Sequence, residues 1–189
     1  MKEKITEQSV KLFQEKGFKE TSIQDIVDLL GVTKGTFYYY FTSKEILLME
    51  IHLRYIDDLL IRQKVIMDST KSNREKIIGI VSLVILDIKK QRANGRVYFR
   101  EMRNLTPENA KKVKKKREEF RLNIVNVLTE GIKSGEFREN IDPKLIALAI
   151  LGVTNWSYNW FNPDGEVSVE ELAEKYVDFV LYGISQKGE

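Results

Sequence analysis

The chain has 189 residues, of which 42% are apolar, and 31 basic against 28 acidic side chains, so it can fill the core of one large or two small domains. It contains no cysteine and a single histidine, which excludes disulfide frameworks, thiolate metal sites and metal sites built on several histidines. Its three prolines all lie beyond residue 106, which favours long helices over a turn-rich β fold. We therefore expect an all-helical protein. The sequence has no P-loop, dinucleotide fingerprint, His-rich metal motif or Gly-x-Ser-x-Gly, so we expect no catalytic site, no metal and no cofactor.

Two segments of the chain decide whether a signal peptide or a membrane span is expected. The first 18 residues carry Glu3, Glu7 and Glu15 among their apolar positions, which is not the pattern of a signal peptide. The longest uncharged run, Leu145 to Asn162, approaches the length of a membrane span, but its Ser, Thr and Asn side chains are too many for a lipid-facing helix. We read this run as a buried helix and expect a soluble, cytoplasmic protein.

Three short helices and a longer fourth helix are predicted for the first 67 residues. Apolar residues at helical spacing predict a first helix over residues 2–16, and Gly17 is positioned to end it. Thr21 or Ser22 can cap a second helix, which Gly31 ends after two to three turns. Thr33 can cap a third, very short helix to about residue 39, and a fourth is expected to run from Ser43 to about residue 67.

The second and third of these helices have the arrangement of a helix-turn-helix, whose second helix enters the major groove of DNA. That helix would begin with Thr33, Lys34, Gly35 and Thr36, which are small or polar apart from one long cation. Gly35 costs about 1 kcal/mol of helix stability relative to alanine, and close approach of the backbone to nucleic acid is a reason to accept this cost. An ordinary helical hairpin remains the alternative on spacing alone.

The aromatic run from Phe37 to Phe41 favours the DNA-binding interpretation. Phe37 and Phe41 are four residues apart, so they share a helix face and are expected to pack into the core. Tyr38 and Tyr39 then point away, and their hydroxyls can bind phosphate oxygens. The alternative is that these tyrosines also pack into the core.

Residues 5–50 resemble the DNA-binding domain of the tetracycline-repressor (TetR) family. The resemblance rests on Thr21-Ser22-Ile23, on the run from Gly31 to Phe41, and on Ser43-Lys44-Glu45. It implies a bacterial, all-helical homodimer with a three-helix reading head and a larger domain that binds a small molecule. Carried over residue by residue, it implies base contacts for Lys34, Gly35 and Thr36, and phosphate contacts for Thr21, Ser22, Thr33, Tyr38, Tyr39 and Lys44. Many relatives have His where this chain has Tyr40, so no role is assigned to Tyr40.

The rest of the chain is expected to form a second helical domain. Helices are predicted near residues 74–92, 95–104, 107–134, 142–161 and 168–186, giving about nine in all. We place the DNA-binding domain at residues 1–46 and the ligand-binding and dimerisation domain at residues 47–189. The last two helices could form a four-helix dimer interface through Ile146, Ile150, Val153, Val177, Val180, Leu181 and Ile184.

Two patterns in the second domain are candidates for ligand binding. Trp156 and Trp160 share a helix face, and they form either the wall of a pocket or an aromatic cluster of the core or dimer interface. The ending Asn-Trp…Trp-Phe-x-Pro-x-Gly resembles the branch of the family that responds to acyl-coenzyme A. Arg96, Arg100 and Arg103 recur at helical spacing, and guanidinium groups match phosphate oxygens, although a solvated basic face is the alternative.

From these patterns and the resemblance, the expected function is that of a homodimeric repressor on a palindromic operator, released by a small molecule such as a long-chain acyl-coenzyme A. A regulator of the same family that senses a different apolar ligand or drug, as in efflux control, is the first alternative. A helical adaptor that binds no DNA is the second. Residues 1–50 hold seven lysines and eight acidic residues, so DNA affinity has to come from a few placed contacts.

Overall fold

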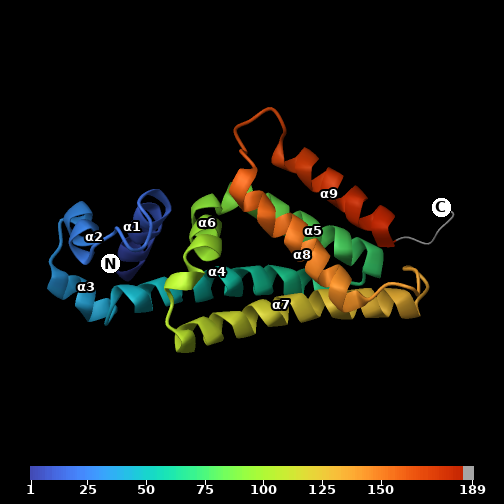
Figure 1. Ribbon diagram of the computed structural model, residues 1–189, viewed down its shortest axis with the longest axis horizontal. Helices are drawn as coiled ribbons and strands as arrows, with labels where there is room; N and C mark the ends of the chain where they lie inside the picture. Colours follow the sequence, from blue (N-terminus) through green and yellow to red (C-terminus); the bar gives the residue numbers. More distant parts are fainter. Residues whose placement is uncertain (185–189) are drawn as a thin grey trace. The chain divides into compact units, whose positions relative to one another are not determined.

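The computed structural model describes residues 1–184, and of residues 183 and 184 only the backbone. Within this range it contains nine α-helices, one 3₁₀ turn and no β-strand, which confirms the expected all-helical fold (Figure 1). The chain divides into two compact units. The first unit comprises residues 1–57 and 93–116, and the second unit comprises residues 58–92 and, within the described range, 117–184. Two long helices, α4 (Lys44–Met67) and α7 (Pro107–Lys133), contribute to both units.

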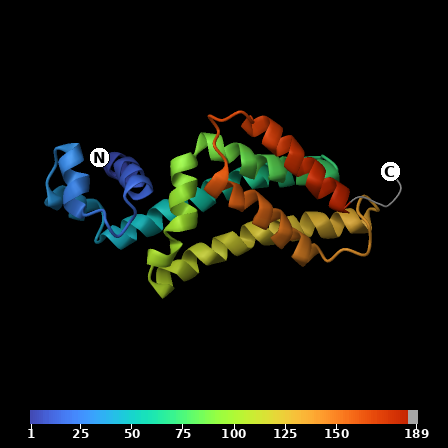
Figure 2. The same cartoon turned by 45° about the horizontal axis from the view of Figure 1, so that its top comes forward.

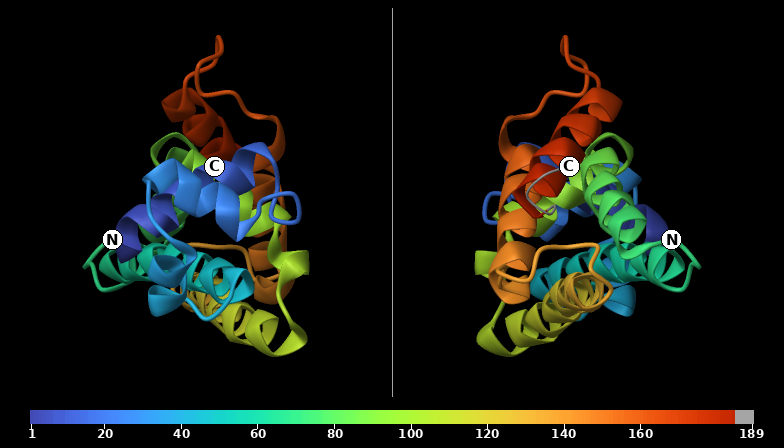
Figure 3. Two further views of the ribbon diagram at one scale, coloured as in Figure 1. Left: turned by 90° about the vertical axis from the view of Figure 1, so that its left-hand side faces the viewer. Right: turned by 90° about the vertical axis from the view of Figure 1, so that its right-hand side faces the viewer.

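Three short helices begin the first unit: α1 (Lys2–Glu15), α2 (Ile23–Leu30) and α3 (Lys34–Tyr40). The left view of Figure 3 shows the molecule from the side of these helices. Helix α2 ends because Gly31 adopts φ +61°, a left-handed conformation that glycine tolerates. Helix α2 packs against both α1 and α3. The fully buried apolar side chains of this part of the unit are Ile5, Phe13, Ile26, Val27, Phe37, Phe41, Leu47 and Leu48.

The first unit is completed by α6 (Arg92–Arg100), the 3₁₀ turn η1 (Met102–Asn104) and the start of α7. Tyr98 of α6 is buried against Tyr55 and His52 of α4, with ring centroids 4.7 and 5.4 Å apart. The carboxylate of Glu45 accepts hydrogen bonds from the side-chain amide of Asn109, at 2.9 and 3.1 Å. These contacts fix α6 and the start of α7 on α4 within this unit.

The second unit is built around α5 (Asn73–Lys90), which packs against α8 (Pro143–Trp160) and α9 (Val169–Ile184), as Figures 1 and 2 show. The capping box of Ser72 with Glu75 starts α5, and Asp142 caps α8 with Pro143 at its first position. Most of the apolar side chains of α5 are buried, as expected for a central helix, although Leu86 is 39% exposed. The buried ones are Ile77, Ile80, Val81, Val84, Ile85 and Ile88.

A buried network of charge joins three helices of the second unit. Asp87 of α5 is 1% exposed and accepts a hydrogen bond from Arg62 of α4 at 2.6 Å and from the hydroxyl of Tyr158 of α8 at 3.1 Å. Arg62 also pairs with Asp58 at 2.6 Å. Burial lowers the pKa of Arg62, but the hydrogen bond and charge of Asp87, with Asp58, outweigh it and raise that pKa above its usual value. The network therefore favours the charged form of Arg62, and the hydrogen bond of Tyr158 to Asp87 joins α8 to α5.

Three expectations from the sequence need correction. The helix expected over residues 95–104 begins at residue 92 and ends at residue 100, because Gly95 is accommodated inside α6 and η1 is a separate turn. The run from Leu145 to Asn162 is buried on one face only. Ile150, Val180 and Leu181 are buried within a single chain against its own core, so these three residues are not free for a dimer interface, while the side chain of Ile184 lies outside the described residues.

Candidate functional site

Helix α3 presents one polar face to solvent because its apolar face is held in the core. Phe37 and Phe41 are 0% and 1% exposed, and their ring centroids are 5.7 Å apart. The opposite face carries Tyr38 and Tyr39, which are 52% and 83% exposed. Lys34 is exposed at the first position of the same helix. The short helix therefore displays its polar residues on a surface that the two phenylalanines anchor.

The N-terminus of α3 is closed by its own threonines. The hydroxyl of Thr33 accepts a hydrogen bond from the backbone N–H of Thr36 at 3.3 Å and lies 3.3 Å from the hydroxyl of Thr36. Gly35 is exposed between them, and a Cβ built there would meet only the Thr33 hydroxyl, at 3.5 Å. The fold itself therefore leaves room for a side chain at Gly35.

Ser22 is exposed and serves as the cap of α2. Its backbone N–H donates to the carboxylate of Asp25 at 2.7 Å, and its hydroxyl also donates to that carboxylate at 2.7 Å. The hydroxyl in turn accepts from the N–H of Asp25 at 3.0 Å. The backbone hydrogen bond and then the hydroxyl of Ser22 hold the pKa of Asp25 below its usual value. A phosphate oxygen only accepts hydrogen bonds, so a phosphate contact by Ser22 has to compete with Asp25 for the hydroxyl proton.

Thr21 and Lys44 lie deeper than the sequence suggested. Thr21 is 0% exposed and its hydroxyl donates to the carbonyl of Gly17 at 2.8 Å, so its side chain is not placed to contact phosphate. The ammonium of Lys44 donates to the carbonyl of Phe18 at 2.6 Å and to the carbonyl of Thr21, and it lies 4.3 Å from the ring centroid of Phe18. Burial lowers the pKa of Lys44. Two of its three N–H groups thus fix the α1–α2 connection, and one remains for a phosphate.

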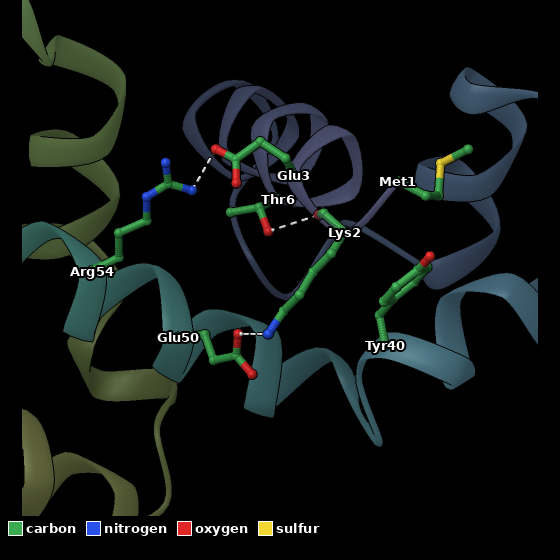
Figure 4. Close-up of a pocket in the computed structure, with 7 residues that line it drawn as sticks. All are labelled: Met1, Lys2, Glu3, Thr6, Tyr40, Glu50 and Arg54. Carbon is green, nitrogen blue, oxygen red and sulfur yellow. Dashed lines mark hydrogen bonds and ion pairs between the residues drawn. The ribbon is translucent and has the colours of Figure 1, made fainter.

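Tyr40, to which no role was assigned, lines a hollow of about 510 Å³ between the start of α1 and α4 (Figure 4). Two ion pairs cross this hollow, Lys2 with Glu50 at 2.6 Å and Arg54 with Glu3 at 2.5 Å. The Tyr40 ring packs edge-on against Tyr39, with centroids 4.9 Å apart. Tyr40 therefore packs against the ring of the exposed Tyr39 and helps to position it.

The residues expected to bind a ligand fall in different units. Arg96, Arg100 and Arg103 belong to the first unit, where Arg96 is half-buried and the other two are exposed. They do not form one continuous helical row, because α6 ends at Arg100. Trp156 and Trp160 belong to the second unit and are 65% and 52% exposed, so within one chain they are not a core cluster. The structure therefore places the three arginines in one unit and the two tryptophans in the other, and of the arginines Arg100 and Arg103 line the same hollow.

Two groups were missed by reading the sequence. Lys16 and Lys19 line the same hollow as Arg100 and Arg103, and no local pattern connects residues so far apart in the chain. The buried Asp87 could have been found, because it is the single charge in the apolar run from Ile77 to Ile88. Among residues 1–184, no group of three His, Asp or Glu side chains is arranged to hold a metal ion. No helix in the same range is long and apolar enough to cross a membrane.

Comparisons with known proteins cover nearly the whole chain. Residues 5–51 match the family described as bacterial regulatory proteins, tetR family, and residues 70–184 match the one described as Tetracyclin repressor-like, C-terminal domain. The chain is 30% identical to the HTH-type transcriptional repressor KstR2 of Mycolicibacterium smegmatis, over 98% of this chain and 91% of the relative. It is 26% identical to the Fatty acid metabolism regulator protein of Bacillus subtilis, over 97% and 95%.

Two solved structures resemble the whole chain. The ketosteroid transcriptional regulator KstR2 of Mycobacterium tuberculosis has a TM-score of 0.89 at 28% identity, covering 98% of this chain and 95% of that structure. The transcriptional regulator PfmR of Thermus thermophilus has a TM-score of 0.88 at 31% identity, covering 96% and 99%. The likeness therefore extends through both the N-terminal helices and the larger helical part.

Proposed function

The chain belongs to the tetR family of bacterial regulatory proteins and is a DNA-binding transcriptional repressor and not an enzyme, and from this premise we propose that it binds a palindromic operator as a homodimer and leaves it when a small molecule binds. Residues 1–46 would read DNA, and residues 47–189 would bind the effector and dimerise. Such a regulator acts on the chromosome, so we place it in the cytoplasm.

The observation that carries this proposal is the exposed polar face of α3 on its buried anchor of Phe37 and Phe41. Lys34, Gly35 and Thr36 stand at the end of the helix that enters the major groove in a helix-turn-helix. We assign base contacts to these three residues. We assign phosphate contacts to Ser22, Thr33, Tyr38, Tyr39 and the free N–H of Lys44, and we omit Thr21 because it is buried.

A gel-shift or polarisation assay with the DNA flanking the gene tests operator binding. If about four to six phosphates are neutralised per dimer, the slope of log affinity against log salt is expected to be about −4 to −5. A palindrome with half-sites about one helical turn apart is expected to bind better than either half alone. Binding that ignores both salt and sequence would contradict the proposal, and the absence of DNA binding would favour the adaptor alternative.

The role of Lys34 is tested against a lysine of the same charge and exposure. Lys34→Ala is expected to lose about 1–3 kcal/mol of base discrimination per half-site, whereas Lys11→Ala, an exposed change on α1, should leave discrimination intact. Tyr39→Phe removes only a hydroxyl and should weaken all sequences alike, by about 0.5–1.5 kcal/mol. Equal losses on operator and random DNA for Lys34→Ala would refute its reading role.

Support for a homodimer comes from the apolar side chains that α8 and α9 leave exposed. Leu145, Leu148 and Trp156 follow one another at helical spacing on α8, and they are 63%, 53% and 65% exposed. Phe179 and Tyr182 are 65% and 80% exposed on α9. A row of large apolar side chains of this kind is typical of a surface that a partner covers. A second copy of the same chain offers a self-complementary partner.

For the effector, we propose a long-chain acyl-coenzyme A. A relative named as a regulator of fatty acid metabolism supports this ligand class, because it is similar over almost the whole chain. The nucleotide phosphates of such a molecule need cationic donors, for which Arg96, Arg100 and Arg103 are our candidates in the first unit. Its acyl chain needs an apolar wall, for which Trp156 and Trp160 are our candidates in the second unit. A different apolar ligand or drug would need the tryptophans but not the arginines.

The effector is identified by titrating fluorescent operator complexes with acyl-coenzyme A thioesters of increasing chain length, beside free coenzyme A and the free acids. Release requires tighter binding to the state that does not bind DNA, since equal affinity for both states shifts nothing. A coupling of about 1–3 kcal/mol would lower operator affinity about 5- to 150-fold. Release by an unrelated apolar compound, with no effect of any thioester at micromolar concentration, would replace the acyl-coenzyme A assignment.

A further inference from the structure

A second hollow in the first unit is lined by cations from two distant segments. It has a volume of about 410 Å³ and lies between the α1–α2 connection and the end of α6 with η1. Lys16 and Lys19 come from the first segment, and Arg100 and Arg103 come from the second. All four belong to the first unit, so the hollow is formed within one compact body.

The four cations are neutralised by the protein only in part. Elsewhere in this unit Lys2, Arg54 and Lys116 each pair with a carboxylate at 2.5–2.6 Å. Within the part of the chain that the structure describes, none of the four side chains at the hollow has an ion pair or a hydrogen bond through its charged group. Like charges gathered in this way repel one another, and an anion that enters the hollow removes the repulsion.

The two acidic residues at the hollow leave it positive. Glu101 is 5% exposed, and its carboxylate is already engaged with the side-chain amide of Asn104 at 2.6 Å. Glu20 is exposed at the rim. Against four basic side chains the two carboxylates leave a net charge of +2, which suits a group with two or more negative charges.

The chemistry of the donors selects phosphate as the anion. Guanidinium groups bind phosphate oxygens in a bidentate fashion, and ammonium groups bind them as point charges, so two of each can surround a pair of linked phosphates. The volume falls in the range of small-molecule sites and accommodates a pyrophosphate with part of a nucleotide. The DNA backbone is a less suitable occupant, because α6 lies on the other side of α1 from α2 and α3 (Figures 1 and 2).

We propose that Lys16, Lys19, Arg100 and Arg103 form a binding site for the linked phosphates of a nucleotide. A single bound pyrophosphate group would bridge the α1–α2 connection to the end of α6. That connection also carries the Phe18 and Thr21 carbonyls held by Lys44 just before α2, so the anion would bind the part of the chain that supports the reading helices. This regulatory consequence rests on the proposed function, whereas binding of the anion does not.

Binding is tested with inorganic pyrophosphate by isothermal titration calorimetry on the full chain, at constant ionic strength so that general screening does not change. Arg100→Gln/Arg103→Gln is expected to weaken binding about tenfold for each guanidinium removed. Lys16→Gln/Lys19→Gln tests the other segment and should weaken it as well. Lys111→Gln/Lys114→Gln removes the same charge from exposed positions of α7 that do not line the hollow, and it should bind as the wild type does.

The source of the phosphates is resolved by comparing three probes. Pyrophosphate, free coenzyme A and an acyl-coenzyme A are titrated in parallel. If all three bind and the Arg100→Gln/Arg103→Gln variant binds each of them more weakly, the nucleotide end lies in the hollow. Binding of pyrophosphate alone assigns the site to a free phosphate compound. Absence of pyrophosphate binding, or an equal loss in the Lys111/Lys114 control, would overturn the site. Operator affinity measured without any anion tests the repressor function separately.

Discussion

Replacing Gly35 by alanine is expected to move protein stability and operator affinity in opposite directions. Gly35 is the second residue of α3 and has an ordinary helical conformation, since the positive φ angles of described glycines are confined to Gly17, Gly31 and Gly135. A Cβ at Gly35 would meet only the Thr33 hydroxyl, at 3.5 Å, which is a normal van der Waals distance. Nothing in the fold opposes the added methyl group.

The expected gain in stability follows from helix propensity. Alanine in place of glycine stabilises a helix by about 0.5–1 kcal/mol, because the unfolded chain loses less backbone freedom on folding. For a chain of this size such a gain corresponds to a rise in Tm of about 1–4 °C. The same methyl group would stand between the α3 backbone and the base edges, so operator affinity should fall by about 1–3 kcal/mol per half-site, as for a mismatched base pair.

The assay pairs thermal unfolding with operator titration on the same preparation. Gly31→Ala is the matched control, because Gly31 is equally exposed but has φ +61°, where alanine costs about 1–2 kcal/mol. This control should lower Tm and leave the operator affinity of the folded protein unchanged. If Gly35→Ala binds the operator as tightly as the wild type, the N-terminus of α3 does not approach the bases and the assignment of the reading face is wrong.

Three further changes test other parts of the molecule. Asp25→Asn should lower Tm at pH 5–7 but not at low pH. The pKa of Asp25 is lowered in the folded protein, so its stabilisation is present above the unfolded pKa of about 3.9 and is lost as the pH falls through the folded pKa. An equal Tm difference at every pH would contradict this prediction. Asp87→Ala should lower the free energy of unfolding in urea by about 3 kcal/mol, because it leaves the guanidinium of Arg62 with only Asp58, and a change under about 1 kcal/mol would show that the network is not stabilising. Trp156→Asp should raise the dimer dissociation constant about thirtyfold in sedimentation without changing Tm of the monomer, whereas loss of effector response with an intact dimer would assign the residue to a pocket wall.

The helices of the head were predictable because their signals are local. Ser22, Gly31 and Thr33 lie at the ends where capping chemistry acts over three or four residues, and the structure confirms each as a cap. The spacing of Phe37 and Phe41 likewise determined which face of α3 is buried. The exposed positions of Tyr38 and Tyr39 follow from that spacing alone.

The errors concern tertiary packing, which capping signals and helical spacing do not encode. Threonine is a residue type that often caps helices at the surface, but the side chain of Thr21 is buried, and its hydroxyl donates a hydrogen bond to the carbonyl of Gly17. The apolar positions Ile150 and Val180 could equally have faced a partner or the chain's own core, and only the packing of α5 on α8 and α9 decides between them. The hollow that Arg100 shares with Lys16 depends on a contact between segments more than 80 residues apart, which no periodicity encodes.

The seven residues of α3 contain a single charged side chain, Lys34, and this scarcity affects how the protein finds its target. Non-specific affinity for DNA arises from neutralised phosphates, so a reading face with one cation holds random sequence weakly. A chromosome offers on the order of 10⁶–10⁹ decoy sites, and each copy bound to a decoy is absent from the operator. Weak electrostatic attraction slows arrival at DNA. It also keeps more copies free, so a small number of molecules per cell can occupy the operator.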